Sequence, residues 1–115
     1  TYYDAQNCAG FFALPDYKQF LFELCEGESI SEPDSQIGQV SSILLGKNIM
    51  ANLYSEKDFG GKTSFQGIFL PLAFSSNNLG QLSSHHGIDS IDNNISSLIV
   101  YAIDDRYNHF IHTRK

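Results

Sequence analysis

The chain carries one pattern twice, and this repeat limits the folds that are open to it. Three positions of the pattern recur 51 residues later, Tyr3, Cys8 and Gly10 becoming Tyr54, Phe59 and Gly61. A serine pair followed by three aliphatic residues also occurs twice, at 41–42 and, 55 residues later, at 96–97. Two copies of this length, each with about four strands, suit a pair of Greek keys packed into one sandwich. We therefore expect one motif over about 1–46 and a second over about 47–103.

Short apolar runs separated by turn signals indicate an all-β sandwich or barrel. The expected strands cover residues 11–14, 20–25, 40–45, 49–54, 63–65, 68–74 and 95–103. Pro71 places the strand over 68–74 at a sheet edge or bulge, because proline cannot donate to a β-ladder. The polar stretch 26–38 is expected to be a loop, and 75–91 a long loop with room for a short helical turn. Residues 104–115 read as a tail or one extra strand.

Composition narrows the class of protein and of partner. A length of 115 residues corresponds to one domain. The net charge of −6 disfavours nucleic acid and anionic membranes as partners. No apolar run approaches the roughly 18 residues of a membrane span, so we expect no membrane insertion. The chain is expected to be a monomer.

Cys8 and Cys25 leave two alternatives open. They lie symmetrically about the turn expected at Pro15 and Asp16, so one disulfide is plausible. It would close a loop of roughly 18 residues and contribute about 3 kcal/mol in the chain-entropy model. Two buried free thiols are the alternative. No cysteine or histidine spacing indicates zinc. The compartment depends on the answer, and a secreted or extracellular location is favoured.

The stretch 92–97 is the one with metal chemistry. It offers one carboxylate, two amide oxygens and two hydroxyls, from Asp92, Asn93, Asn94, Ser96 and Ser97. Ca²⁺ takes six to eight oxygen ligands of these kinds. Asparagine, aspartate and serine are also ordinary loop residues, so this stretch alone is a weak signal.

The two patterns together resemble a known family. Tyr54-x-x-x-x-Phe59-x-Gly61, followed by Asp92-Asn93-x-x-Ser96-Ser97, is similar to the βγ-crystallin Greek key motif of the calcium-binding type found in microbial and invertebrate members. Tyr3-x-x-x-x-Cys8-x-Gly10 with Ser41-Ser42 resembles the partner motif. The resemblance spans about residues 1–103. It implies a non-enzymatic, two-motif sandwich with two quasi-equivalent calcium sites, in which Ca²⁺ mainly stabilises the fold.

The same resemblance implies a ligand set for the calcium ions. It comprises the Asp4, Gln39, Ser55 and Asn94 backbone carbonyls, the Ser41 and Ser96 hydroxyls, and the Asn93 side chain. The first copy departs from the pattern, because Gly38 stands where the family has a side-chain ligand. We expect one fair site using Asn93 and Ser41 and one degraded site using Ser96. With so few carboxylates, Kd should lie at about 10⁻⁵ to 10⁻³ M.

Other functions remain as alternatives. A secreted protein-binding module, such as an inhibitor or toxin-like effector, would need an exposed apolar patch or a disulfide-braced loop. A carbohydrate-binding or adhesion module of a larger protein would be favoured by exposed aromatic residues in a row. Ser84, His86 and Asp89 have the residue types of a catalytic triad but share one polar loop, so we expect no enzyme. Paired histidines and a glycosylation sequon at 94–96 are weaker signals than calcium binding.

Overall fold

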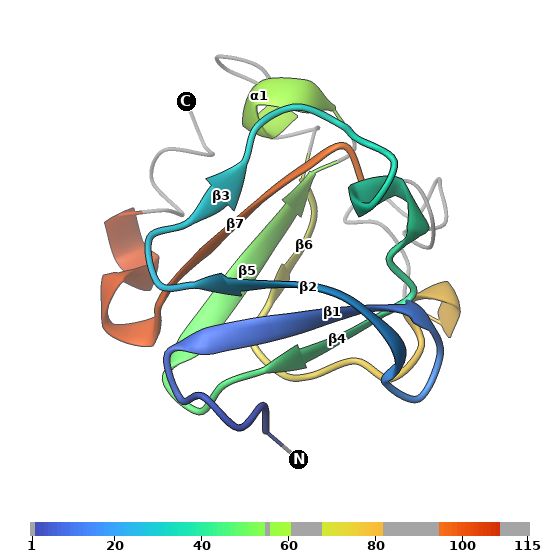
Figure 1. The fold of residues 1–115 in the computed structure, drawn as a ribbon. Coiled ribbons are helices and arrows are strands. Elements are labelled where there is room, and N and C mark those ends of the chain that lie inside the picture. The colour runs from blue at the N-terminus through green and yellow to red at the C-terminus, as the bar shows by residue number, and fades with distance from the viewer. Residues whose placement is uncertain (1, 55, 61–67, 82–94, 109–115) are drawn as a thin grey trace.

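Two antiparallel sheets pack around a shared core in the computed structural model (Figure 1). The structure describes residues 2–54, 56–60, 68–81 and 95–108. The first sheet has the order β2-β1-β4, formed by β1 Cys8–Leu14, β2 Lys18–Cys25 and β4 Ser42–Leu45. The second has the order β3-β7-β5-β6, formed by β3 Ser29–Ile30, β5 Ile49–Tyr54, β6 Ile68–Leu72 and β7 Ser97–Ala102. The all-β expectation is confirmed.

Each half of the chain lends one short segment to the sheet of the other half. β3, from the first half, pairs with β7 through Ser29 and Ile30. In return, Ser76 forms a bridge to Ile43 on the free edge of β4. This exchange is the crossover that two interlocked Greek keys require. The loop expected over 26–38 is therefore wrong at β3, a strand of two residues that is too short to show alternation.

Short helices fill the connections. They are η1 Ile37–Gln39, α1 Lys57–Gly60, η3 Leu79–Gln81 and η4 Ile103–Asp105. η3 is the helical turn for which the sequence left room. β6, with Pro71 opposite Asn52, lies at the edge of its sheet as proline predicts. The expected strand over 63–65 and the tail from 109 onward lie outside the described residues. No helix in the described ranges is long and apolar enough to span a membrane.

The core is formed by inward-facing side chains of both sheets and of the η1 and η3 connections. Its fully buried large members are Phe11, Ile37, Ile43, Leu45, Ile49, Leu53, Leu79, Leu98, Val40 and Val100. Phe11 on β1 stacks on Phe22 of β2, with ring centroids 4.7 Å apart. Every side chain of β5 is buried, so both faces of this strand are shielded from solvent. Burial of this kind is the main stabilising term of the sandwich.

Cys8 and Cys25 are directly opposite each other in the register of β1 and β2, and they form a disulfide. The alternative of two buried free thiols is therefore excluded in this structure. The bond joins the first residue of β1 to the last residue of β2, at the end of the hairpin away from its turn. It closes the loop that contains both strands and stabilises the hairpin chiefly by restricting the unfolded chain.

The first copy of the repeat is not where the sequence placed it. Tyr3 to Gly10 does not form a hairpin, because Cys8 already begins β1 and the chain runs straight on to Leu14. The turn comes after Leu14, where Asp16 and Tyr17 have φ of 63° and 59°. Asp58 and Phe59 have nearly the same φ, 53° and 59°, in the second copy. The true first copy is therefore Phe12-x-x-x-x-Tyr17-x-Gln19, which lies 42 positions before the second.

Candidate metal centre

Two serines at equivalent positions hold the two hairpins closed. The Ser42 hydroxyl accepts a hydrogen bond from the Tyr17 N–H at 3.1 Å and donates to the Leu14 carbonyl at 2.7 Å. The Ser97 hydroxyl accepts from the Phe59 N–H at 3.0 Å and donates to the Glu56 carbonyl at 2.6 Å. A serine at the start of β4 and another at the start of β7 thus tie the two hairpins. Both hydroxyls are committed to the backbone and are poor candidates for metal ligands.

The aromatic pairs of the two hairpins match as well. Phe12 and Tyr17 meet edge to face with centroids 5.9 Å apart and planes at 65°. Tyr54 and Phe59 do the same at 5.7 Å and 67°. Such edge-to-face pairs are a favoured aromatic geometry. The aromatic spacing and the turn dihedrals thus identify the same pair of copies as the serine hydrogen bonds do.

The serines one position earlier, Ser41 and Ser96, are the candidate ligands. The Ser41 N–H donates to the Phe12 carbonyl and the Ser96 N–H to the Tyr54 carbonyl, each at 2.8 Å. Ser41 is only 6% exposed, and its carbonyl accepts from the Leu79 N–H at 2.8 Å. Its hydroxyl has no hydrogen-bond partner among the described residues. A buried hydroxyl without a partner costs free energy unless water or an ion satisfies it.

The corrected register changes one proposed ligand. The residue after the first aromatic of the first hairpin is Ala13 rather than Asp4. Asp4 lies in the N-terminal arm, where the neighbouring Tyr3 N–H donates to the Leu45 carbonyl at 2.9 Å. Leu45 ends β4, whereas Ser41 immediately precedes it, so the structure does not bring Asp4 and Ser41 together. The repeat pattern in the sequence did not point to Ala13, because the first copy has Gln19 where the second copy has Gly61. Gln19 has a φ of 61°.

Gln39 ends η1, two residues before Ser41 on the same connection. Its side-chain Nε2 donates to the Ser35 carbonyl at 2.7 Å, which turns the amide away from a ligand role and leaves the backbone carbonyl as the candidate donor. The start of η1 is fixed by Asp34, whose Oδ1 accepts from the Ile37 N–H at 2.7 Å. The remaining predicted ligands, Ser55, Asn93 and Asn94, lie outside the described residues. So do Ser84, His86 and Asp89, which have the residue types of a catalytic triad.

A buried polar network that the sequence did not predict lies behind the second hairpin. Tyr101 on β7 donates from its hydroxyl to the Asn52 Oδ1 at 2.8 Å, and Asn52 Nδ2 donates to the Tyr54 hydroxyl at 3.2 Å. Burial raises the pKa of Tyr54 and of Tyr101, so both phenols stay neutral near pH 7. The polar residue Asn52 inside an otherwise apolar strand was the signal available in the sequence.

These features agree with comparisons to known structures. Neither a protein-family model nor a curated protein sequence matches the chain. A βγ-crystallin domain of the Abundant Perithecial Protein of Neurospora crassa, solved in its Ca²⁺-bound form, aligns with a TM-score of 0.66 and 12% identity, over 90% of this chain and 98% of that chain. The chain has the βγ-crystallin fold.

Bacterial and animal βγ-crystallins align in the same way. A domain from Flavobacterium johnsoniae gives a TM-score of 0.56 with 16% identity, over 83% of this chain and 94% of that one. The βγ-crystallin of Ciona intestinalis gives 0.54 with 18% identity, over 80% and 96%. Identities this low establish the fold alone. The family resemblance inferred from the hairpin and serine pattern is thereby confirmed at the level of fold, and these neighbours are βγ-crystallin domains rather than enzymes.

Proposed function

We propose that this βγ-crystallin domain binds Ca²⁺ at its hairpin ends and that the ion mainly stabilises the fold. The observation that carries the proposal is the Ser41 hydroxyl, which is buried, lacks a partner among the described residues and lies beside the first hairpin. Ser96 occupies the equivalent place beside the second hairpin. The Ca²⁺-bound state of the Neurospora crassa domain supports the same chemistry in a protein of this fold.

The donors available at the first hairpin are all oxygen atoms. We assign the Ala13 and Gln39 carbonyls and the Ser41 hydroxyl to this site, with the Asn93 side chain as the donor from the other motif. Ala13 replaces Asp4, which lies at the far end of β4. Oxygen donors without soft ligands suit a hard cation such as Ca²⁺. Because every assigned donor is neutral, the affinity should be weak, with Kd at about 10⁻⁵ to 10⁻³ M.

The second site is assigned the Ser55 and Asn94 carbonyls and the Ser96 hydroxyl. The side chain that the first motif should contribute is missing, because Gly38 stands in its place. We therefore propose that the second site binds more weakly than the first. An ion bound only by the folded chain adds RT ln(1 + [L]/Kd), which is about 1–3 kcal/mol for a weak site at millimolar calcium.

Paired serine variants test this proposal. Ser41→Ala and Ser96→Ala each remove one candidate hydroxyl with little change in volume, and Ser29→Ala removes a hydroxyl from the exposed β3 residue as a control. We expect Ser41→Ala to lose most of the calcium-dependent rise in Tm, Ser96→Ala to lose less, and Ser29→Ala to behave like the wild type. The proposal fails if millimolar Ca²⁺ produces neither binding heat nor a change in Tm in the wild-type domain.

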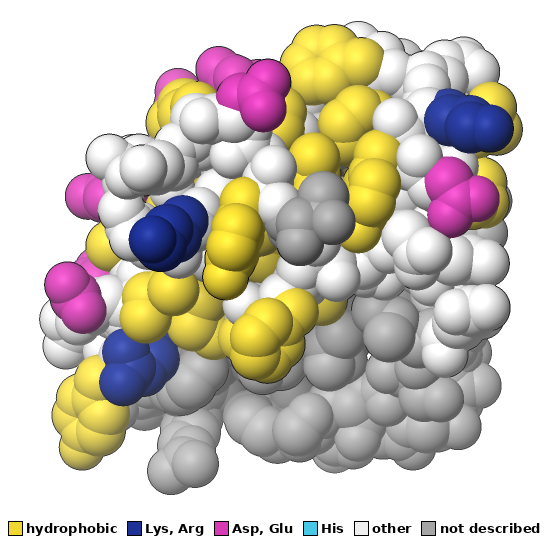
Figure 2. Space-filling view, turned by 90° about the horizontal axis from the view of Figure 1, so that it is seen from below, with side chains coloured by type: hydrophobic (Ala, Val, Ile, Leu, Met, Phe, Trp, Pro, Cys, Tyr) yellow, Lys and Arg dark blue, Asp and Glu magenta, His cyan; other side chains and the backbone are white. Residues whose placement is uncertain are grey.

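Carbohydrate binding is a second candidate function, favoured by aromatic side chains on the outer face of the first sheet. Phe12 meets Phe20 edge to face at 5.7 Å and Tyr17 at 5.9 Å, and Phe20 is 55% exposed. Beside Tyr17 a cavity of about 310 Å³ is also lined by the exposed Tyr2 and Phe74. Figure 2 shows apolar side chains gathered on this side of the molecule. Exposed aromatic patches of this kind often mark binding surfaces.

A glycan array separates this candidate from calcium binding. If the aromatic face binds sugars, the wild-type domain should retain a defined set of glycans and Phe74→Ala should release them, while its calcium response stays intact. Retention of no glycan above the level seen with Phe74→Ala would rule the candidate out.

A further inference from the structure

We propose that Cys8, Glu23 and Cys25 form a second metal site, for Zn²⁺, that exists only when the disulfide is reduced. In the oxidised chain the two sulfur atoms are bonded to each other. In the reduced chain they become two thiolates beside a carboxylate. Soft thiolate donors select Zn²⁺ over Ca²⁺, so this site is chemically distinct from the one proposed at the hairpin ends.

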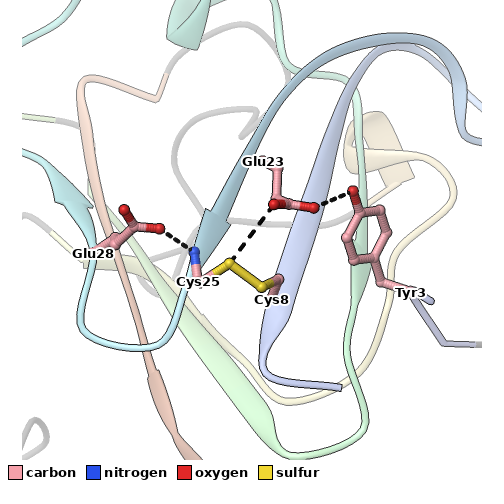
Figure 3. Close-up of a disulfide and its surroundings, with 5 residues drawn as sticks. All are labelled: Tyr3, Cys8, Glu23, Cys25 and Glu28. Atoms are coloured by element: carbon pink, nitrogen blue, oxygen red, sulfur yellow. Dashed lines mark hydrogen bonds between the residues drawn. A yellow bond between two sulfur atoms is a disulfide. The ribbon is translucent and has the colours of Figure 1, made fainter. Parts of the chain in front are cut away.

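The strand register brings the three ligands to one face. Cys8 on β1 is directly opposite Cys25 on β2, and Glu23 precedes Cys25 by two residues, so both project to the same side of the sheet. Their ligand atoms all lie within 4.8 Å of one another. Figure 3 shows the Glu23 carboxylate facing the sulfur pair. Glu23 is exposed and both cysteines are half-buried, so a metal ion can reach the group from solvent.

Tyr3 orients the carboxylate. Its hydroxyl donates to Glu23 Oε1 at 2.6 Å (Figure 3). Its ring lies on Gly10, where an added Cβ would be 2.5 Å from the ring. The other oxygen, Oε2, lies 3.7 Å from the Cys25 sulfur. A disulfide sulfur carries no proton, so that contact is not a hydrogen bond, and Oε2 is left facing the sulfur pair. Partners of this kind, which orient a metal ligand, commonly change affinity by about 10–100-fold.

Formation of the site takes two steps, reduction of the disulfide and binding of Zn²⁺ with release of two protons. A dithiol gives two electrons and two protons to the Cys8–Cys25 bond, which becomes two thiols while the dithiol becomes a disulfide. Zn²⁺ then displaces the two thiol protons and forms two Zn–S bonds, with Glu23 as third ligand and water as fourth. Zn–S bonds of about 2.3 Å and Zn–O bonds of about 2.0 Å place tetrahedral donors roughly 3.5–3.8 Å apart. The 3.7 Å between Glu23 Oε2 and the Cys25 sulfur is within this range. The two sulfurs, bonded to each other in the oxidised chain, reach it by separating after reduction.

Co²⁺ absorption followed by Zn²⁺ competition tests the proposal on the whole domain, oxidised or treated with a phosphine reductant. We expect one metal ion per reduced chain, with the charge-transfer bands of thiolate ligation, and none per oxidised chain. Glu23→Gln should weaken Zn²⁺ binding by at least about tenfold, whereas Glu26→Gln, an equal charge change at a neighbouring residue outside the group, should not. Tyr3→Phe should weaken binding by about tenfold while the absorption spectrum and the stoichiometry stay unchanged.

If reduction unfolds the chain, the proposal is tested by refolding with Zn²⁺. Zn²⁺ should then restore the β-sheet circular dichroism in the wild type and not in Glu23→Gln, because metal binding and folding are coupled. A reduced chain that neither binds Zn²⁺ nor refolds with it refutes the site. Equal binding by Glu23→Gln and the wild type refutes the carboxylate ligand, and equal binding by the oxidised chain refutes the redox gate.

Discussion

Removal of the serine that closes a hairpin should destabilise the domain by about 2 kcal/mol. Ser97 is fully buried, and its hydroxyl bonds the Phe59 N–H at 3.0 Å and the Glu56 carbonyl at 2.6 Å. Ser97→Ala removes both bonds and leaves almost no cavity. A hydrogen bond contributes about 1 kcal/mol net to stability, so the loss is about 2 kcal/mol. Ser42→Ala removes an equivalent pair of bonds, and the expected cost is the same.

Thermal unfolding in calcium-free buffer measures this loss. At about 2.1 cal/mol/K of unfolding entropy per residue, a chain of this length loses about 4 °C of Tm per kcal/mol, so each variant should melt about 8 °C lower. Ser29→Ala, on the short exposed edge strand, is the matched control and should change Tm by no more than about 2 °C. If Ser97→Ala melts with the control while Ser42→Ala does not, the two hairpins are not equivalent. If neither variant is destabilised, the serine ties are not structural supports.

Three further predictions follow from other parts of the chain. Gly38 has open space around the position of an added Cβ and no positive φ, so an aspartate can be accommodated there. Gly38→Asp should supply the missing ligand and lower the calcium Kd of the weaker site by about tenfold in calorimetry, whereas Gly38→Ala should not. Reduction of Cys8–Cys25 in metal-free buffer should cost about 3 kcal/mol and lower Tm by about 12 °C; an unchanged melt would show that the disulfide contributes nothing. The hydrogen bond to Glu23 raises the pKa of Tyr3 to about 12, which favours the folded state up to pH 10 and is lost between pH 10 and about pH 12. In urea unfolding, the wild type should therefore lose stability relative to Tyr3→Phe over that interval. Parallel stability curves for the two proteins would contradict the Tyr3–Glu23 bond.

Alternating or continuous apolar runs predicted most of the sheet. Ile49–Tyr54 was predicted with the bounds that β5 has, because its ends are marked by polar residues on both sides. β3 was missed because a two-residue strand gains its stability from pairing with β7, a contact distant in sequence. The disulfide was left undecided because sequence spacing does not reveal register, and the facing positions of Cys8 and Cys25 decide it.

At the candidate site, the repeat pattern in the sequence placed the first hairpin at the wrong residues. Glycine is favoured at a hairpin position with positive φ, and the repeat pattern aligned Gly10 with Gly61. The structure instead places Gln19 in that conformation and uses Gly10 for close contact with the Tyr3 ring. The turn dihedrals, the paired aromatic residues and the serine hydrogen bonds together identify the first hairpin. The serine pairs were found from sequence alone because both copies retain them beside an aliphatic strand.

Binding of Ca²⁺ where the hairpins meet the serine pairs is tested most directly by amide chemical shifts recorded during a calcium titration. We predict saturable shifts at Leu14, which follows the Ala13 carbonyl, and at Ser41 and Ser42, with smaller ones at Ser97. The arm around Asp4 should remain unchanged, because it lies at the other end of β4. Saturable shifts confined to the arm, or no saturable shifts at any of these positions, would contradict calcium binding at the hairpin ends.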